Sequence, residues 1–245
     1  MPDILQLLRA SWQIYRNHAA LLSGLFAWLL IPKAGVVLLQ NMQDDVRKIV
    51  GTAFLTLLSL VLAIWVVSIA IVSIRAILEG EQKLNLDQVR SHVRPLLLPF
   101  ILTAILQFLV TFGGYLLLIV PGIIFSIWYA FVNFAVLLDR KRVLEAFTFS
   151  RNLVRGRFWS VFARLVGGII VVSIIYSIPM SLLTLGWSFL TDTPLPLSSN
   201  TLFENQPWIW IGVIDSILQT LVIFPILLIY GTALYLELKK SPRPA

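Results

Sequence analysis

The amino-acid sequence predicts an all-helical, polytopic membrane protein (all-α class), and three observations lead to that fold class. First, 58% of the 245 residues are apolar, only 13% are charged, and the mean hydropathy is +0.89. A soluble domain is about half apolar and a quarter charged, so this chain has too little charge to cover a soluble surface. Second, apolar runs recur at the length of about 20 residues that a helix needs to cross the hydrocarbon core. Third, Lys and Arg gather in alternate connections between those runs.

The first two membrane spans are expected at residues 19–39 and 49–74. A polar stretch at residues 40–48 separates them. Each run is long enough to cross the roughly 30 Å hydrocarbon core as a single helix. The two runs therefore predict one helix each.

A helical hairpin is expected next, at residues 96–138. These 43 residues contain no charged side chain, and as one helix they would be about twice as long as the hydrocarbon core is thick. The run must therefore fold back. Gly113-Gly114 and Pro121-Gly122 interrupt it, because glycine permits turn conformations and proline lacks the N–H that a continuing helix would use.

Two more spans, at residues 161–185 and 208–236, bring the expected number to six. The whole chain, residues 1–245, is interpreted as a single integral membrane domain. Within it, three repeats of a cytoplasmic amphipathic helix followed by a transmembrane hairpin are possible, over residues 3–80, 83–138 and 141–240. The repeat is a hypothesis that depends on a short similarity between residues 11–18 and 150–157.

The distribution of positive charge predicts the orientation, because the side with the excess of Lys and Arg stays in the cytoplasm. One side of the expected topology collects 16 of the 19 basic residues. These are Arg9, Arg16, Arg75, Lys83, Arg90, Arg94, Arg140, Lys141, Arg142, Arg151, Arg155, Arg157, Arg164, Lys239, Lys240 and Arg243. Both termini are therefore expected in the cytoplasm, with the protein in a plasma membrane, the bacterial inner membrane. The net charge of +7 comes from basic residues gathered on one side of the expected membrane topology, so nucleic acid is not an expected partner.

Amphipathic helices are expected on the cytoplasmic side at residues 3–18, 85–95 and 141–157, where polar residues recur at steps of three and four. Asn85 and Gln88 have the spacing of a helix-capping box. One interpretation is that these helices lie in the headgroup region, with their basic residues on anionic lipid. The other is a docking platform for a membrane-protein partner. For a phosphate-bearing ligand, a lipid headgroup or a partner, the candidate residues are Arg151, Arg155 and Arg157.

Two charged side chains, Lys33 and Asp215, fall well inside predicted spans, where a charge costs at least about 2.5 kcal/mol. Both are expected at a similar depth near the outer side, so they are candidates for an intramembrane pair. Alternatively, Lys33 extends outward along its stem and Asp215 borders the outer water. A proton or ion relay is the less favoured reading. The amides of Gln107, Asn133 and Gln219 are expected to bond between helices rather than to line a polar path.

Catalytic and metal sites are not expected. The chain has no Cys and only two His residues, which excludes disulfides and an ordinary zinc site. One Lys and one Asp are too few to supply an acid, a base and a nucleophile. The sequence therefore predicts a protein that is not an enzyme and has no cofactor.

The stretch from Gly113 to Phe162 resembles a known family. The matching features are Pro121-Gly122, a span that ends at Asp139, then Glu145-Ala146, Ser150, Leu153-Val154 and Gly156 to Trp159. These features resemble the membrane domain found beside some bacterial glycerophosphoryl diester phosphodiesterases, and related stand-alone bacterial integral membrane proteins. The resemblance implies an all-helical membrane protein that serves as an anchor, an assembly element or a lipid-handling module. It does not imply phosphodiesterase activity, because in two-part members a separate soluble barrel carries the metal ligands and histidines of catalysis.

The sequence thus favours a non-enzymatic integral membrane protein, a scaffold or accessory that presents a basic cytoplasmic face to anionic lipids or to a protein partner. The alternative is a transporter or permeability element for a lipid or small solute, with Lys33 and Asp215 in the path.

Overall fold

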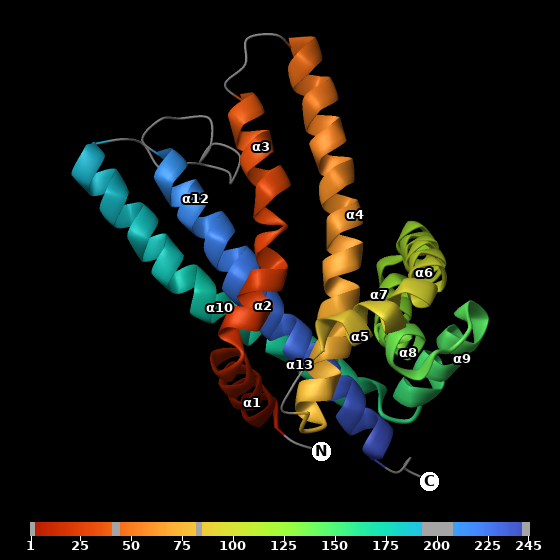
Figure 1. The fold of residues 1–245 in the computed structure, drawn as a ribbon. Helices are drawn as coiled ribbons and strands as arrows, with labels where there is room; N and C mark the ends of the chain where they lie inside the picture. The colour runs from red at the N-terminus through yellow and green to blue at the C-terminus, as the bar shows by residue number, and fades with distance from the viewer. Residues whose placement is uncertain (1–2, 41–44, 82–84, 193–207, 242–245) are drawn as a thin grey trace. The chain divides into compact units, whose positions relative to one another are not determined.

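The computed structural model describes residues 3–40, 45–81, 85–192 and 208–241. Within those ranges every regular element is a helix and no strand occurs, which confirms the all-helical class (Figure 1). Five helices of the described chain are long and apolar enough to cross a membrane, and a sixth span is present if one bent helix pair is counted as one. The expected number of about six spans is therefore confirmed.

The first expected span is broken rather than straight. Residues 19–39 form α2 (Ala19–Ala27) and α3 (Leu30–Gln40), bent by 41° at the break. Pro32 lies in the first turn of α3, and a proline ring clashes with the carbonyl four residues earlier, here that of Trp28. A single helix across residues 19–39 would place that clash in its interior, so the chain ends one helix and begins another.

Two long helices contain the second and fifth expected spans. They are α4 (Asp45–Leu78) and α10 (Phe158–Thr191), each 34 residues long. At 1.5 Å per residue, such a helix is about 51 Å long and exceeds the roughly 30 Å hydrocarbon core. The helices therefore extend beyond the predicted spans, 49–74 and 161–185, at both ends.

The expected hairpin is present, but its turn lies between the two predicted interruptions and not at either of them. α6 (Leu97–Leu117) runs to Leu118, whose extended backbone reverses the chain into α7 (Ile119–Trp128), and α8 (Val132–Asp139) follows. Gly114 and Gly122 lie inside the two helices, where the chains come close. A Cβ added at Gly122 would lie 2.4 Å from the Tyr115 ring, and one at Gly114 would lie 2.7 Å from the Phe125 ring. The glycines thus permit close packing of α6 on α7.

Shorter helices flank the spans. α1 (Ile4–Asn17) buries Leu7, Leu8 and Tyr15, and burial raises the pKa of the Tyr15 phenol. α5 (Leu86–Val93) begins as expected at Asn85, whose side chain accepts from the backbone N–H groups of Asp87 and Gln88. A 3₁₀ turn (Arg94–Leu96) joins α5 to α6, and α9 (Val143–Val154) follows the hairpin.

The last span is built from α12 (Ile209–Leu218), a π-helical segment (Gln219–Ile223) and α13 (Phe224–Lys240). Pro225 has no N–H to donate to the carbonyl four residues earlier, so regular α-helical bonding cannot continue across this point. The π-helical segment lies where that bond is lost.

The chain divides into two compact units, each described here by itself. The first unit comprises Met1–Asn17, Ile64–Gly168 and Leu228–Ala245. The second comprises His18–Ala63 and Ile169–Leu227. The threefold repeat stays a prediction, and Lys83, the start of its second member, lies outside the described residues.

The core of the first unit contains α8 and α13. Tyr235 packs against Phe131 and Phe134, with ring centroids 5.9 and 5.7 Å away. Its hydroxyl donates to one carboxylate oxygen of Asp139, and Lys239 Nζ donates to the other at 2.5 Å. The end of α8 is thereby fixed to α13. In the second unit Phe26 and Phe224 meet edge to face at 5.6 Å.

Candidate functional site

Lys33 lies in the second unit and its charge is held by a hydroxyl. The ammonium donates to Thr220 Oγ1 at 2.7 Å. Lys33 belongs to the first turn of α3, and the buried Thr220 belongs to the π-helical segment. A π-helical turn is rare and frequently occurs at functional positions. Here it supplies the acceptor for an amine in a predicted span.

Asp215, also in the second unit, is held by two other groups. Its carboxylate accepts from the Tyr176 hydroxyl of α10 and from Gln219 Nε2 at 3.0 Å. Gln219 therefore bonds to Asp215 along one continuous helix, and it also forms a hydrogen bond with Tyr176 of α10, so it bonds between helices as expected. Its neighbour in sequence is Thr220, so the partners of Asp215 and of Lys33 are consecutive residues.

The structure thus places Lys33 and Asp215 in one polar network of the second unit, which also contains Tyr176, Gln219 and Thr220. Among the described residues, no hydrogen bond or ion pair joins the two charges directly. Their hydrogen-bond partners are neutral, and the two opposite charges also attract each other electrostatically. A direct Lys33–Asp215 pair stays a prediction, and the network indicates that each charge is solvated by neutral donors or acceptors. The other two mid-span amides also bond between helices as expected, because Asn133 Nδ2 of α8 donates to Gln107 Oε1 of α6 at 2.9 Å.

The first unit carries the basic segment, defined here as residues 140–157, which includes α9. It has six basic residues and one acidic residue, Glu145. Four of the six guanidinium or ammonium side chains belong to exposed residues: Arg140, Arg142, Arg151 and Arg155. Arg140 has a left-handed backbone with φ 51 and lies 2.8 Å from His92 Nδ1. The other three are free of acidic partners within the described chain.

The three arginines singled out from the sequence have different surroundings. Arg151 lies over the Trp128 ring, 4.6 Å from its centroid. Arg157 donates to two backbone carbonyls, Leu153 O at 3.0 Å and Leu238 O at 2.9 Å. Leu238 lies in the last turn of α13, where carbonyls lack helical partners, so Arg157 satisfies one of them. A ligand role for Arg157 stays a prediction, since its guanidinium already has structural contacts.

Arg155 lies at an apolar groove of about 590 Å³ in the first unit. The groove is open to the surface, and the other lining residues come from α7, from the connection before α10 and from the start of α10. They are Val120, Ile123, Ile124, Trp128, Gly156, Phe158, Trp159 and Phe162. Arg155 is exposed, and its guanidinium makes no hydrogen bond or ion pair in the described part of the chain. The groove therefore combines an apolar wall with one available positive charge.

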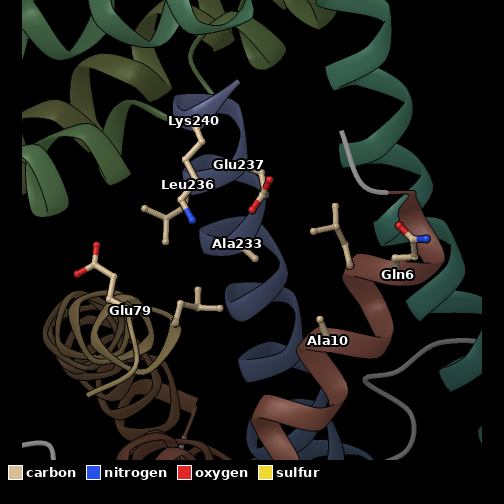
Figure 2. Close-up of a pocket in the computed structure, with 9 residues that line it drawn as sticks. Gln6, Ala10, Glu79, Ala233, Leu236, Glu237 and Lys240 are labelled. Carbon is tan, nitrogen blue, oxygen red and sulfur yellow. The ribbon is translucent and has the colours of Figure 1, made fainter. Parts of the chain in front are cut away.

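A second cavity of the first unit, the cleft, has a volume of about 370 Å³. Figure 2 shows Gln6 and Ala10 on α1, Glu79 just after α4, and Ala233, Leu236, Glu237 and Lys240 on α13. Leu7 and Leu78 complete the lining. Glu79 pairs with Arg75 at 2.8 Å, and none of the nine lining residues is Ser, Thr, His or Cys. The cleft is therefore lined by no hydroxyl, thiol or imidazole side chain of the described chain.

The sequence does not predict several tertiary hydrogen bonds that stabilise the first unit. Ser150 is fully buried; its hydroxyl donates to Trp128 O at 2.7 Å and accepts from Phe131 N at 3.3 Å. Arg75 donates to Leu138 O, near the end of α8, at 2.5 Å. The only advance signal for Ser150 was its place among the residues of the family resemblance.

The described residues contain no group of three or more His, Asp or Glu side chains that could hold a metal ion. What the fold does define is a class: with five or six apolar helices of spanning length, this is a multi-pass membrane protein. Within that class, the chain belongs to the family described as a domain of unknown function, DUF7847, whose model matches residues 46–238. No curated protein and no solved structure matches the chain.

Proposed function

We propose that the protein is a non-enzymatic integral membrane protein of a bacterial inner membrane, a scaffold or accessory that binds anionic lipids through its cytoplasmic face. One observation carries the proposal: the basic segment has six positive residues against one acidic residue, and four of the positive residues are exposed. Basic residues beside a membrane span are attracted to anionic headgroups by about 1 kcal/mol each. The segment lies directly between two candidate spans, Ile119–Asp139 and Phe158–Thr191.

The location and orientation of the chain are part of the same proposal. The excess of Lys and Arg supports a cytoplasmic position for both termini and for the basic segment. The resemblance of residues 113–162 to membrane domains that accompany glycerophosphoryl diester phosphodiesterases supports an anchoring or lipid-handling role. The amphipathic pattern of residues 3–18 and 141–157 supports helices that lie along the membrane surface.

The test is charge reversal at two exposed arginines of the basic segment, Arg142→Glu and Arg151→Glu combined. The protein is extracted with surrounding lipid in copolymer nanodiscs, and phosphatidylglycerol is measured relative to the bulk membrane. We expect the enrichment of phosphatidylglycerol to be lost in the double variant, because anionic headgroups are then repelled. The matched control is Arg47→Glu, an exposed arginine in the first turn of α4 that belongs to the opposite predicted side.

Unchanged phosphatidylglycerol enrichment in the double variant would refute lipid binding by the basic segment. The accessory role is tested separately, by native mass spectrometry of the gently extracted wild-type protein. A stoichiometric membrane-protein partner supports the accessory role. A chain or homo-oligomer that carries only lipid favours lipid handling instead.

A second candidate function is transport of a lipid or small solute, and the polar network of the second unit favours it. Lys33, Asp215 and their neutral partners are polar groups inside candidate spans. Charged side chains are energetically costly inside a membrane, and they often mark the pathway of a substrate or ion. In proteoliposomes, a transporter predicts a solute flux that Lys33→Met or Asp215→Asn abolishes. Flux that is absent from the wild type, or that both variants keep at the wild-type rate, excludes this function for the network.

A further inference from the structure

The groove of the first unit has the shape and chemistry of a site for one amphiphile. Its apolar wall comes from two helices: Val120, Ile123 and Ile124 on α7, and Trp159 and Phe162 on α10. Its volume of about 590 Å³ falls in the range of roughly 300–1,000 Å³ that small-molecule sites occupy. Both helices belong to candidate membrane spans, so the groove faces the environment of acyl chains.

Charge at the groove is limited to one side chain. Arg155 is the only charged lining residue, and its guanidinium is unpartnered in the part of the chain that the structure describes. Arg157, two positions on, has its guanidinium on the carbonyls of Leu153 and Leu238. Gly156 separates the two with φ 83, a backbone conformation that favours glycine, and its positive φ turns the chain between them. The Arg155 guanidinium is therefore available to bind a ligand, whereas the Arg157 guanidinium is hydrogen-bonded to α13.

The surroundings of Arg155 select a negative charge. The basic segment contains one acid, Glu145, which does not line the groove. Arg151 adds a second positive charge, placed over Trp128, itself a lining residue. A guanidinium binds a phosphate with two parallel hydrogen bonds, and tryptophan is typical of the interface where headgroup meets acyl chain. A ligand with a phosphate and a long apolar body satisfies both ends of the groove.

We infer that the groove is a stoichiometric binding site for one anionic phospholipid, with the phosphate on Arg155 and an acyl chain along the α7–α10 wall. The inference rests on the proposed function and deepens it, because it assigns one lipid molecule to one site. A general attraction of lipid to the basic segment would need neither the groove nor Arg155 in particular.

The experiment titrates the purified full-length protein in detergent with phosphatidylglycerol or phosphatidylcholine of identical acyl chains, and counts bound lipids by native mass spectrometry. We expect one phosphatidylglycerol per chain to persist at activation energies that remove the others. Arg155→Gln weakens its affinity by about fivefold, the contribution of one basic residue to an anionic headgroup. The matched control is Arg9→Gln, which removes an exposed arginine of α1, a helix that does not line the groove.

A second pair of variants tests the apolar wall. Val120→Trp fills the groove and lowers occupancy of the persistent site by both lipids, while Leu102→Trp, at an exposed position of α6, does not. Each variant is checked for helical content and melting temperature, and Ile123→Phe replaces Val120→Trp if the latter does not fold. Equal retention of the two lipids by the wild type, or wild-type retention in Arg155→Gln or in the groove-filling variant, overturns the inference.

The two proposals fail separately. If Arg142→Glu with Arg151→Glu abolishes enrichment of phosphatidylglycerol but Arg155→Gln and Val120→Trp leave the persistent lipid in place, the basic face binds lipid and the groove is not the site. If the double variant keeps full enrichment, the proposed function itself is wrong.

Discussion

Ser150 shows how one hydroxyl can replace two helical hydrogen bonds. α7 ends at Trp128 and α8 begins at Val132, and at this break Trp128 O and Phe131 N have no backbone partner in the described part of the chain. The buried Ser150 hydroxyl donates to Trp128 O and accepts from Phe131 N. A buried backbone group without a partner costs about 1–3 kcal/mol, so this side chain stabilises the break between the helices.

Ser150→Ala is therefore expected to lower the free energy of unfolding by about 1–3 kcal/mol, because it leaves a buried carbonyl and N–H without partners. The measurement is a denaturation curve of the purified protein in mixed micelles. Ser177→Ala is the matched control: Ser177 is exposed on α10 and bonds only within its own helix, so a change within about 0.5 kcal/mol is expected. Equal effects of the two substitutions would show that Ser150 does not satisfy the break.

At the residue scale, the sequence identifies polar side chains that lie within apolar runs. It does not identify side chains that hydrogen-bond to backbone groups of distant residues. Lys33 and Asp215 stand out as charges within apolar runs, and the Gln107–Asn133 bond follows from two amides at mid-depth in adjacent spans. Ser150 and Arg157 bond to carbonyls, and every residue has a carbonyl, so residue identity gives no signal of which one is chosen. The partner of Arg157 on α13 is 81 positions away.

Among the elements, the α6–α7 hairpin depends on where two helices come closest. At Gly122 an added Cβ would lie 2.4 Å from the inner atoms of the Tyr115 ring, whereas at Gly113 nothing lies within 4 Å. The two glycines lie in the two helices of one hairpin but have opposite packing environments, so they form a matched pair.

Gly122→Ala is expected to destabilise the protein by about 1–3 kcal/mol, the typical cost of overpacking. Gly113→Ala adds a methyl group in open space and removes a flexible residue from a helix, so it is neutral or stabilising by up to about 1 kcal/mol. Melting temperatures of the two variants in one detergent make the comparison. A larger loss for Gly113→Ala than for Gly122→Ala would contradict the packing described for the hairpin.

At the element scale, the sequence predicts where the spanning helices lie. It predicts the ends of the helices and the positions of the turns less accurately. Apolar runs located all the spans, because the membrane thickness sets a minimum length. Glycine and proline were interpreted as turn residues, yet the chain reverses at Leu118, between the Gly and Pro pairs. Glycine serves both turns and close contacts, and only the positions of neighbouring helices decide which.

For the whole molecule, the testable expectation is topology. The chain has no Cys, so single cysteines can report which side of the membrane they face. An impermeant maleimide is expected to label Asp45→Cys in intact cells and Arg142→Cys only after permeabilisation, because the excess of Lys and Arg predicts a cytoplasmic basic segment. Both residues are exposed, so access does not limit the reaction. The opposite labelling pattern would invert the proposed orientation.

The number of spans could be predicted at this scale because it follows from hydropathy and length alone. The groove could not, because its residues come from positions 120–128 and 155–162 and meet only through packing. Arg155 was among three candidates chosen for charge. Its distinction from Arg157 depends on where the carbonyl of Leu238 lies, which no local pattern encodes.

The bonds of Asp139 also have a consequence for biogenesis. The α6–α7 hairpin closes through a single residue, so little chain entropy opposes it, and it can form as soon as both helices have left the ribosome. Asp139, at the end of α8, cannot form its hydrogen bond with Tyr235 until that residue, 96 positions later in the chain, has been synthesised. At about 5–20 residues per second, that delay is roughly 5–20 s. During this interval the carboxylate lacks both Tyr235 and Lys239, so the nascent first unit exposes an unsatisfied acid until the final helix is made.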